Sequence, residues 1–141
     1  MAAFNKIQNF VEDLGKGVHQ LHAAGHTLKV YLSNAVPSAS LDAVKADLAE
    51  IGAGNGYNAG GEDVQNDATE AAGTLTVTGV DVTWTASGGT IGPFQYVVLY
   101  NDTPGAPVDP LIGWWDYGSA LTLQAGESFT ADFGASLFTV A

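Results

Sequence analysis

Three histidines, His19, His22 and His26, lie in one eight-residue stretch near the start of the sequence. On a helix, His19 and His22 would share a face because they are three residues apart. A zinc site needs such convergent nitrogens and an open coordination position. The sequence has no His-Glu-x-x-His pattern, however, and Gly25 is expected to end a helix before His26. We therefore expect histidines solvated near a helix end, where the dipole favours them, and neither a metal nor a cofactor.

A second group of residues that could do chemistry is acidic. Four carboxylates crowd residues 62–70, and paired carboxylates can hold Ca²⁺ or perform acid–base catalysis. Their spacing does not match an EF-hand loop, so we interpret them as a solvated acidic loop, with weak Ca²⁺ binding as the alternative. The four residues are Glu62, Asp63, Asp67 and Glu70.

The glycine-rich residues 52–56 resemble a phosphate-binding loop only superficially. They lack the Gly-Lys-Ser/Thr ending of a P-loop, and a flexible turn is the simpler interpretation. The chain also has no cysteine, no Gly-x-Ser-x-Gly motif and no histidine after His26. Because no nucleophile and base are paired by any of these patterns, we expect that the protein is not an enzyme.

Aromatic residues suggest a different chemistry, the binding of a partner. Trp114, Trp115 and Tyr117 fall in one predicted strand, where side chains alternate between the two faces. At least one tryptophan therefore belongs to the core, and the other is a candidate contact to a neighbouring subunit or a ligand. Two phenylalanines of the N-terminal apolar stripe complete the candidate interface, which consists of Phe4, Phe10, Trp114, Trp115 and Tyr117.

The elements that must position these residues change character along the chain. Apolar residues at spacings of three or four predict a helix over residues 4–21 and a second helix over 41–51, with a strand at 28–32 between them. Residues 52–73 are rich in glycine and acid, which is typical of a long surface loop. From residue 74 onward strands are separated by turns, with Val82 and Trp84 on one face of a strand and Thr83 and Thr85 on the other. Residues 94–100 (FQYVVLY) are the strongest strand, and further strands are predicted at 111–117, at 121–123 and at 137–140.

This order predicts one domain over residues 1–141 of the α+β class, mainly β. We expect an antiparallel β-sandwich or small barrel with two helices on its N-terminal side. Its parts are a helix–strand–helix segment in residues 1–51, the Gly/acidic loop in 52–73 and the antiparallel β part in 74–141.

Charge is distributed unevenly over a chain whose net charge is −11. Residues 1–45 carry all four lysines and three carboxylates, whereas residues 46–141 carry twelve carboxylates and no base. Nucleic acids and anionic membranes are bound by basic side chains, so neither is expected as a partner. Residues 1–13 lack the basic and apolar regions of a signal peptide, and no apolar stretch approaches the roughly 18 residues of a transmembrane helix.

Several longer strings follow one another along nearly the whole chain. They are FNK and FVEDL in residues 4–14, LKVYLSNAVPS in 28–38, GYNAGG in 56–61, PFQYVVLYND in 93–102, LIGWWDYGS in 111–119 and GESFT in 126–130. In this order they resemble a widespread family of small virion proteins of tailed bacteriophages. The resemblance supplies no catalytic residues.

The resemblance implies a virion structural protein, made in the host cytoplasm and placed on the capsid surface. The first expectation is a decoration or cement protein that binds the major capsid protein and copies of itself as a homo-oligomer. The alternatives are a fibre, neck or tail-associated component, or a carbohydrate- or receptor-binding module. If the near-neutral N-terminal segment faces the shell, deleting residues 1–26 should abolish attachment and leave the β part folded.

Overall fold

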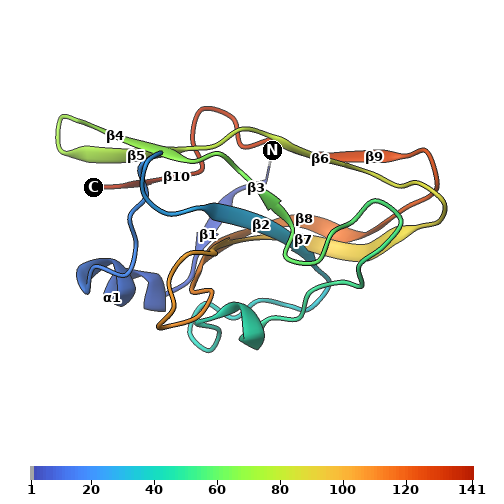
Figure 1. Cartoon of the computed structure of the whole chain (residues 1–141), viewed down its shortest axis with the longest axis horizontal. Coiled ribbons are helices and arrows are strands. Elements are labelled where there is room, and N and C mark those ends of the chain that lie inside the picture. The colour runs from blue at the N-terminus through green and yellow to red at the C-terminus, as the bar shows by residue number, and fades with distance from the viewer. Residues whose placement is uncertain (1) are drawn as a thin grey trace.

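The computed structural model describes residues 2–141 and arranges ten strands in two layers (Figure 1). One layer is a five-stranded sheet; the other consists of a three-stranded and a two-stranded sheet placed end to end, and every pairing is antiparallel. In sheet order, the first layer is β1 (Phe4–Lys6), β8 (Leu111–Leu123), β7 (Ile91–Asn101), β2 (Leu28–Ser33) and β3 (Glu62–Asp63). The second layer is β10 (Phe138–Val140), β5 (Thr74–Thr78) and β4 (Asp67–Ala71), followed by β6 (Val82–Thr85) and β9 (Ser128–Ala131).

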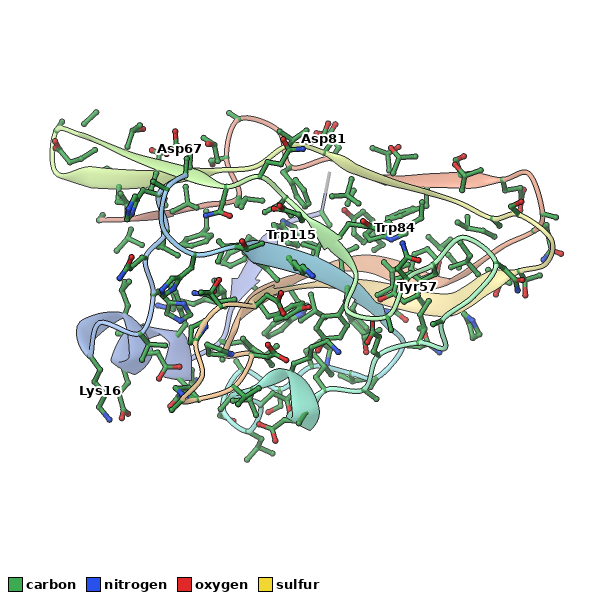
Figure 2. All side chains as sticks on the ribbon, viewed as in Figure 1. Lys16, Tyr57, Asp67, Asp81, Trp84 and Trp115 are labelled. Atoms are coloured by element: carbon green, nitrogen blue, oxygen red, sulfur yellow. The ribbon has the colours of Figure 1, made fainter. Side chains whose placement is uncertain are left out.

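The two layers enclose an apolar core, with Trp84 and Trp115 between them (Figure 2). The alternation predicted around Trp84 is confirmed, because Val82 and Trp84 are buried while Thr83 and Thr85 face solvent. The ring centroid of Trp115 lies 5.0 Å from that of Phe133, which follows β9 by two residues. The fold is therefore α+β and mainly β, as predicted, with the layering of a sandwich.

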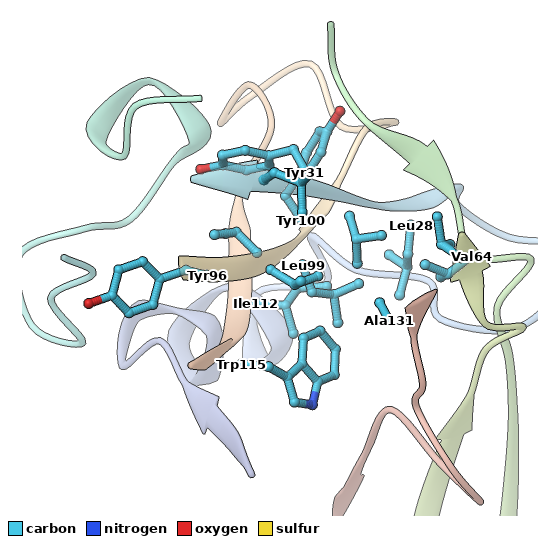
Figure 3. Packing of buried hydrophobic residues seen from close by; sticks show 14 of the residues in the cluster. Leu28, Tyr31, Val64, Tyr96, Leu99, Tyr100, Ile112, Trp115 and Ala131 are labelled. Atoms are coloured by element: carbon cyan, nitrogen blue, oxygen red, sulfur yellow. The ribbon is translucent and has the colours of Figure 1, made fainter. Parts of the chain in front are cut away.

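The outer face of the five-stranded sheet is covered as well. Helix α1 (Asn9–Gly15) and residues 34–51, which include the 3₁₀ helix η1 (Lys45–Asp47), lie beneath it in Figure 1. Burial on both faces explains why the predicted strand at residues 94–100 is a nearly continuous apolar run. Figure 3 shows Tyr31 and Tyr100 on one side of the sheet and Trp115 on the other. No helix within residues 2–141 combines the length and apolar character needed to cross a membrane.

A carboxylate ties the covering segment to the loop that follows it. Glu50 Oε1 lies 2.8 Å from Lys45 Nζ, and Glu50 Oε2 accepts hydrogen bonds from the Tyr57 hydroxyl at 2.6 Å and the Gly60 amide at 2.7 Å. The Tyr57 hydroxyl also accepts a hydrogen bond from the Leu32 amide at 3.0 Å. This amide lies on the edge of β2 beyond the residues that β3 pairs with, so the tyrosine supplies the partner that a strand would otherwise provide. Burial alone would raise the pKa of Glu50, but these hydrogen bonds lower it.

Two tyrosines of the sheet complete this network. The hydroxyl of Tyr31 donates to the Leu48 carbonyl at 2.8 Å, and that of Tyr100 donates to the Gly60 carbonyl at 2.6 Å. The Lys45 ammonium lies 4.8 Å from the centre of the Tyr31 ring and 5.8 Å from that of Tyr100. Burial raises the pKa of both tyrosines, so their hydroxyls stay protonated and keep donating.

The structure corrects both predicted helices. Helix α1 ends at Gly15, two residues before Gly17, whose φ of 77° is a left-handed conformation that stops a helix. The helix predicted over residues 41–51 is wrong apart from the single turn η1. Its backbone pairs instead with a distant loop, since the Leu111 amide donates to Ala43 and the Lys45 amide donates to Asp109. This tertiary pairing overrides the helical spacing of the apolar residues.

Three other boundaries differ from those expected. The loop predicted over residues 52–73 contains β3 and β4, and the strands predicted at 111–117 and 121–123 form one strand, β8, with irregular register. Residues 1–26 are not a separable arm, because they supply β1 together with the buried side chains of Ile7 and Phe10. Deleting them would open the core, contrary to the expectation from the sequence.

The Glu50 network yields a stability prediction. Glu50→Gln removes the charge that accepts from Lys45, Tyr57 and Gly60, so the free energy of unfolding in urea should fall by about 2 kcal/mol. Glu12→Gln is the matched control, because Glu12 also pairs with a lysine, Lys16, but on the exposed surface of α1. The control should cost less than about 0.5 kcal/mol. Equal losses in the two variants would contradict the role given to Glu50.

Candidate functional site

The two sides of the sandwich are built differently. On one side the chain crosses from the first layer to the second as β3 leads into β4, and the 54–57 turn lies beside β6, where the Ser87 amide donates to the Asn55 carbonyl. On the other side, β1 and β10 are the edges of their sheets, and no strand of residues 2–141 pairs with their outer edges. A groove of about 700 Å³ lies between these two edge strands.

Aromatic rings line this groove. The Phe4 ring stacks on Phe138 at 5.2 Å and meets the edge of Trp115 at 5.2 Å, while Phe10 packs edge-on against Phe138 at 5.5 Å. The rings come from β1, β10, β8 and α1, so four elements build one apolar surface. The residues around the groove are Ala2, Ala3, Phe4, Lys6, Phe10, Val11, Leu14, Trp115, Ser136, Leu137, Phe138, Thr139, Val140 and Ala141.

Lys6 has the one charged side chain among the groove residues. The other three lysines each pair with a carboxylate: Lys16 with Glu12, Lys29 with Asp102 and Lys45 with Glu50. Within residues 2–141, Lys6 has no carboxylate at salt-bridge distance. The groove therefore combines an apolar lining with one lysine that forms no salt bridge within residues 2–141, in a chain whose net charge is −11.

The backbone of β1 also faces this side. The Ile7 amide donates to the Ile112 carbonyl at 2.9 Å, and the register pairs Lys6 with Gly113. Because amides alternate in direction along an antiparallel strand, those of Phe4 and Lys6 point away from β8. An edge strand with free amides and carbonyls is a template for another extended chain.

The structure brings together three of the five predicted interface residues. Phe4, Phe10 and Trp115 share the groove, although Phe10 and Trp115 are each only 2 % exposed and belong mainly to the core. Trp114 faces the opposite side of β8, as the alternation predicted. Tyr117 lies on the Trp115 side, where its ring packs edge-on against Phe129 at 5.0 Å, but it does not reach the groove.

The contribution of β10 to the groove was not predicted from the sequence. Leu137 and Phe138 were assigned to the last strand, but no local pattern indicates that this strand lies opposite β1. Strand order is set by long-range pairing, and the pairing of β10 with β5 spans about half of the chain. A signal for the groove was therefore absent from the residues themselves.

The histidines form a second cluster, centred on the buried amide of Asn101. Its Nδ2 lies 3.0 Å from His19 Nδ1 and 2.9 Å from His26 Nδ1, while its Oδ1 accepts from the Thr103 amide at 3.2 Å. Nδ2 is therefore the donor, and both imidazoles accept, as only neutral rings can. Burial lowers the pKa of His19 to about 4, and the nearby His26 adds a smaller effect.

A loop, not the predicted helix, carries these histidines. The Asn66 side chain donates to the carbonyls of Leu21 and His26 and accepts from the Leu28 amide, so it fixes the loop to the start of β2. His22 takes no part in the Asn101 contacts. In residues 2–141 no three histidines or carboxylates are grouped so as to hold a metal ion.

The crowded carboxylates of residues 62–70 serve as local anchors. Asp67 accepts from the amides of Ala23 and Ala68, and these hydrogen bonds lower its pKa. Glu70 accepts from the Gly73 amide in the turn between β4 and β5. Asp67 and Glu70 therefore bind different parts of the backbone and do not converge on one point. The glycine-rich residues 52–56 form the turn beside β6.

The position of β1 depends on a glycine in β8. A Cβ on Gly113 would overlap the Phe4 ring and the Asn5 carbonyl, so Gly113→Ala should displace β1 and lower the free energy of unfolding by about 2 kcal/mol. Urea unfolding and hydrogen exchange at the Asn5 amide measure both effects. Gly105→Ala is the control, because its Cβ would meet nothing within 4 Å. Unchanged stability and exchange in Gly113→Ala would contradict this packing.

The histidine cluster predicts a dependence of stability on pH. The pKa of His19 is about 4 in the folded protein and near 6.5 when unfolded, so the unfolded chain binds more protons between these values. The contribution of neutral His19 is complete above pH 6.5 and should be lost as the pH falls toward 4. His19→Gln should flatten this part of the profile in urea unfolding, and His22→Gln should not. An unchanged profile in His19→Gln would exclude His19 as its source.

Comparison with known proteins adds no constraint on these two clusters. No family model, no curated protein and no solved structure matches the chain. Any function must therefore be argued from the geometry of the groove, the charge distribution and the sequence strings described above.

Proposed function

We propose that the protein is a structural subunit of a tailed-bacteriophage particle, made in the host cytoplasm and bound to the capsid surface. In this role it is a decoration or cement protein, which stabilises the shell by binding the major capsid protein and copies of itself. The observation that carries the proposal is the apolar groove between two unpaired edge strands. The unpaired backbone of such edges can bind another extended chain, and the aromatic rings beside it offer apolar contact area, which favours a role in assembly.

The covering layer offers a second surface for assembly. Leu41 and Val36 are 81 % and 79 % exposed, and Val108 is 63 % exposed on the neighbouring loop. The two loops are joined by backbone hydrogen bonds, from Lys45 to Asp109 and from Leu111 to Ala43. Exposed apolar side chains on fixed loops suit contact with a shell, and the interaction energy of such contacts is what a cement protein supplies.

The distribution of charge is consistent with this arrangement. All four lysines lie in residues 1–45, whereas every charged side chain in residues 46–141 is an aspartate or a glutamate. Two of these acids, Asp67 and Asp81, lie on the second layer, away from the covering loops (Figure 2). A particle that presents the second layer to solvent places these two carboxylates where salt screens the repulsion between copies.

The alternative functions are also those of virion proteins. A fibre, neck or tail-associated component would use the same edge strands in fewer copies. A carbohydrate- or receptor-binding module needs exposed aromatic platforms, but Trp84 and Trp115 are 1 % and 2 % exposed and Trp114 is half-buried. No described tryptophan is therefore a fully exposed platform, which favours the assembly role.

Quantitative peptide mass spectrometry of purified particles tests the proposal. We expect peptides of this chain at a copy number comparable with that of the major capsid protein, because decoration proteins follow the symmetry of the shell. A few copies per particle would move the protein to the neck, tail or fibre. Complete absence from purified particles would contradict a structural role.

A further inference from the structure

We propose that the groove is the contact between two copies of this chain, which pair their β1 strands antiparallel across a two-fold axis. Isologous contacts of this kind are the commonest way in which identical subunits associate. The pairing would extend the five-stranded sheet across the interface and cover the aromatic lining of the groove. This contact specifies how copies of the proposed capsid-bound protein associate with one another. Its role in the particle rests on that proposed function.

The free backbone of β1 permits a self-complementary register. The outward groups belong to Phe4 and Lys6, and the side chain of Asn5 between them lies on the other face. With the two-fold axis at Asn5, Phe4 of each copy lies opposite Lys6 of the other copy. Both residues then exchange amide and carbonyl hydrogen bonds with the second copy, so no outward group of β1 remains unpaired.

The side chains fit the same register. Phe4 and Lys6 are two residues apart and therefore lie on one face of β1, and both border the groove. Directly opposite residues in an antiparallel pair are close enough to interact, so Lys6 of one copy would lie beside the Phe4 ring of the other. An ammonium over an aromatic ring is favourable, and Lys6 has no carboxylate to compete for it within residues 2–141.

The distribution of charge favours the groove over the other faces of the molecule as the place where two copies meet. Two chains of net charge −11 repel each other wherever their carboxylates meet. No aspartate or glutamate side chain lines the groove, whereas the second layer carries Asp67 and Asp81 on the surface shown in Figure 2. Contact through the groove keeps these acidic surfaces apart. Added salt should therefore strengthen the association, because it screens the remaining repulsion.

Sedimentation equilibrium of the purified full chain tests this proposal. We expect a dimer of twice the 14.5 kDa chain mass. Lys6→Glu should raise the dimer dissociation constant at least about tenfold, since it places a carboxylate beside Phe4 of the second copy. Lys16→Glu is the matched control: it changes the net charge equally, but on α1 outside the groove, and should leave the constant within about twofold. Urea midpoints show whether both variants remain folded.

Hydrogen exchange identifies the surface that is used. The amides of Phe4 and Lys6 should exchange more slowly as the protein concentration rises, because they become paired only in the dimer. Exchange that is independent of concentration, or equal weakening by Lys6→Glu and Lys16→Glu, would overturn the proposal. A monomer at every concentration would overturn it too, and particle cross-links from Lys6 to the shell protein would identify the shell as the occupant.

The two proposals fail in different ways. A protein that is abundant in particles but monomeric in solution contradicts the dimer and leaves the virion role standing. A dimer through β1 that is absent from particles contradicts the virion role and leaves the contact standing.

Discussion

Burial of both faces of the five-stranded sheet is the constraint on which the rest of the structure depends. The second layer covers one face, and α1 with residues 34–51 covers the other. A covering segment with little regular structure needs side-chain anchors, and Glu50 provides one by pairing with the Lys45 and Tyr57 side chains and the Gly60 amide. The Tyr57 hydroxyl in turn accepts a hydrogen bond from the buried Leu32 amide of β2. One ionised group thereby joins the loop layer, the sheet and the sheet edge.

This way of covering the sheet leaves the two sides of the sandwich unequal. The passage from β3 to β4 and the turn before Tyr57 occupy one side, whereas no strand of residues 2–141 covers the other. There β1 and β10 end their sheets beside a groove lined by Phe4, Phe10 and Phe138. The arrangement provides binding surface without a convergent set of reactive groups, which is consistent with the assembly role proposed for the chain.

The β elements could be predicted wherever one strand carries its own pattern. The apolar run at residues 94–100 and the alternation around Trp84 are local signals, and both lie in strands as expected. The helix expected over residues 41–51 failed because Ala43 and Lys45 pair with a loop some 65 residues away. Glu50 and Asn101 gave no signal, since their partners converge only in the folded chain. Three of the predicted interface residues, Phe4, Phe10 and Trp115, line the groove, but the groove itself was not predicted, because Phe138 reaches it through the pairing of β10 with β5.

The central claim is that the groove between β1 and β10 is filled in the assembled particle. Electron cryomicroscopy of that particle, at a resolution that separates strands, tests it most directly. The account requires this chain to be found on the shell surface with a second polypeptide running antiparallel to β1 and covering Phe4. A reconstruction in which the chain is present but the groove opens to solvent would contradict the claim.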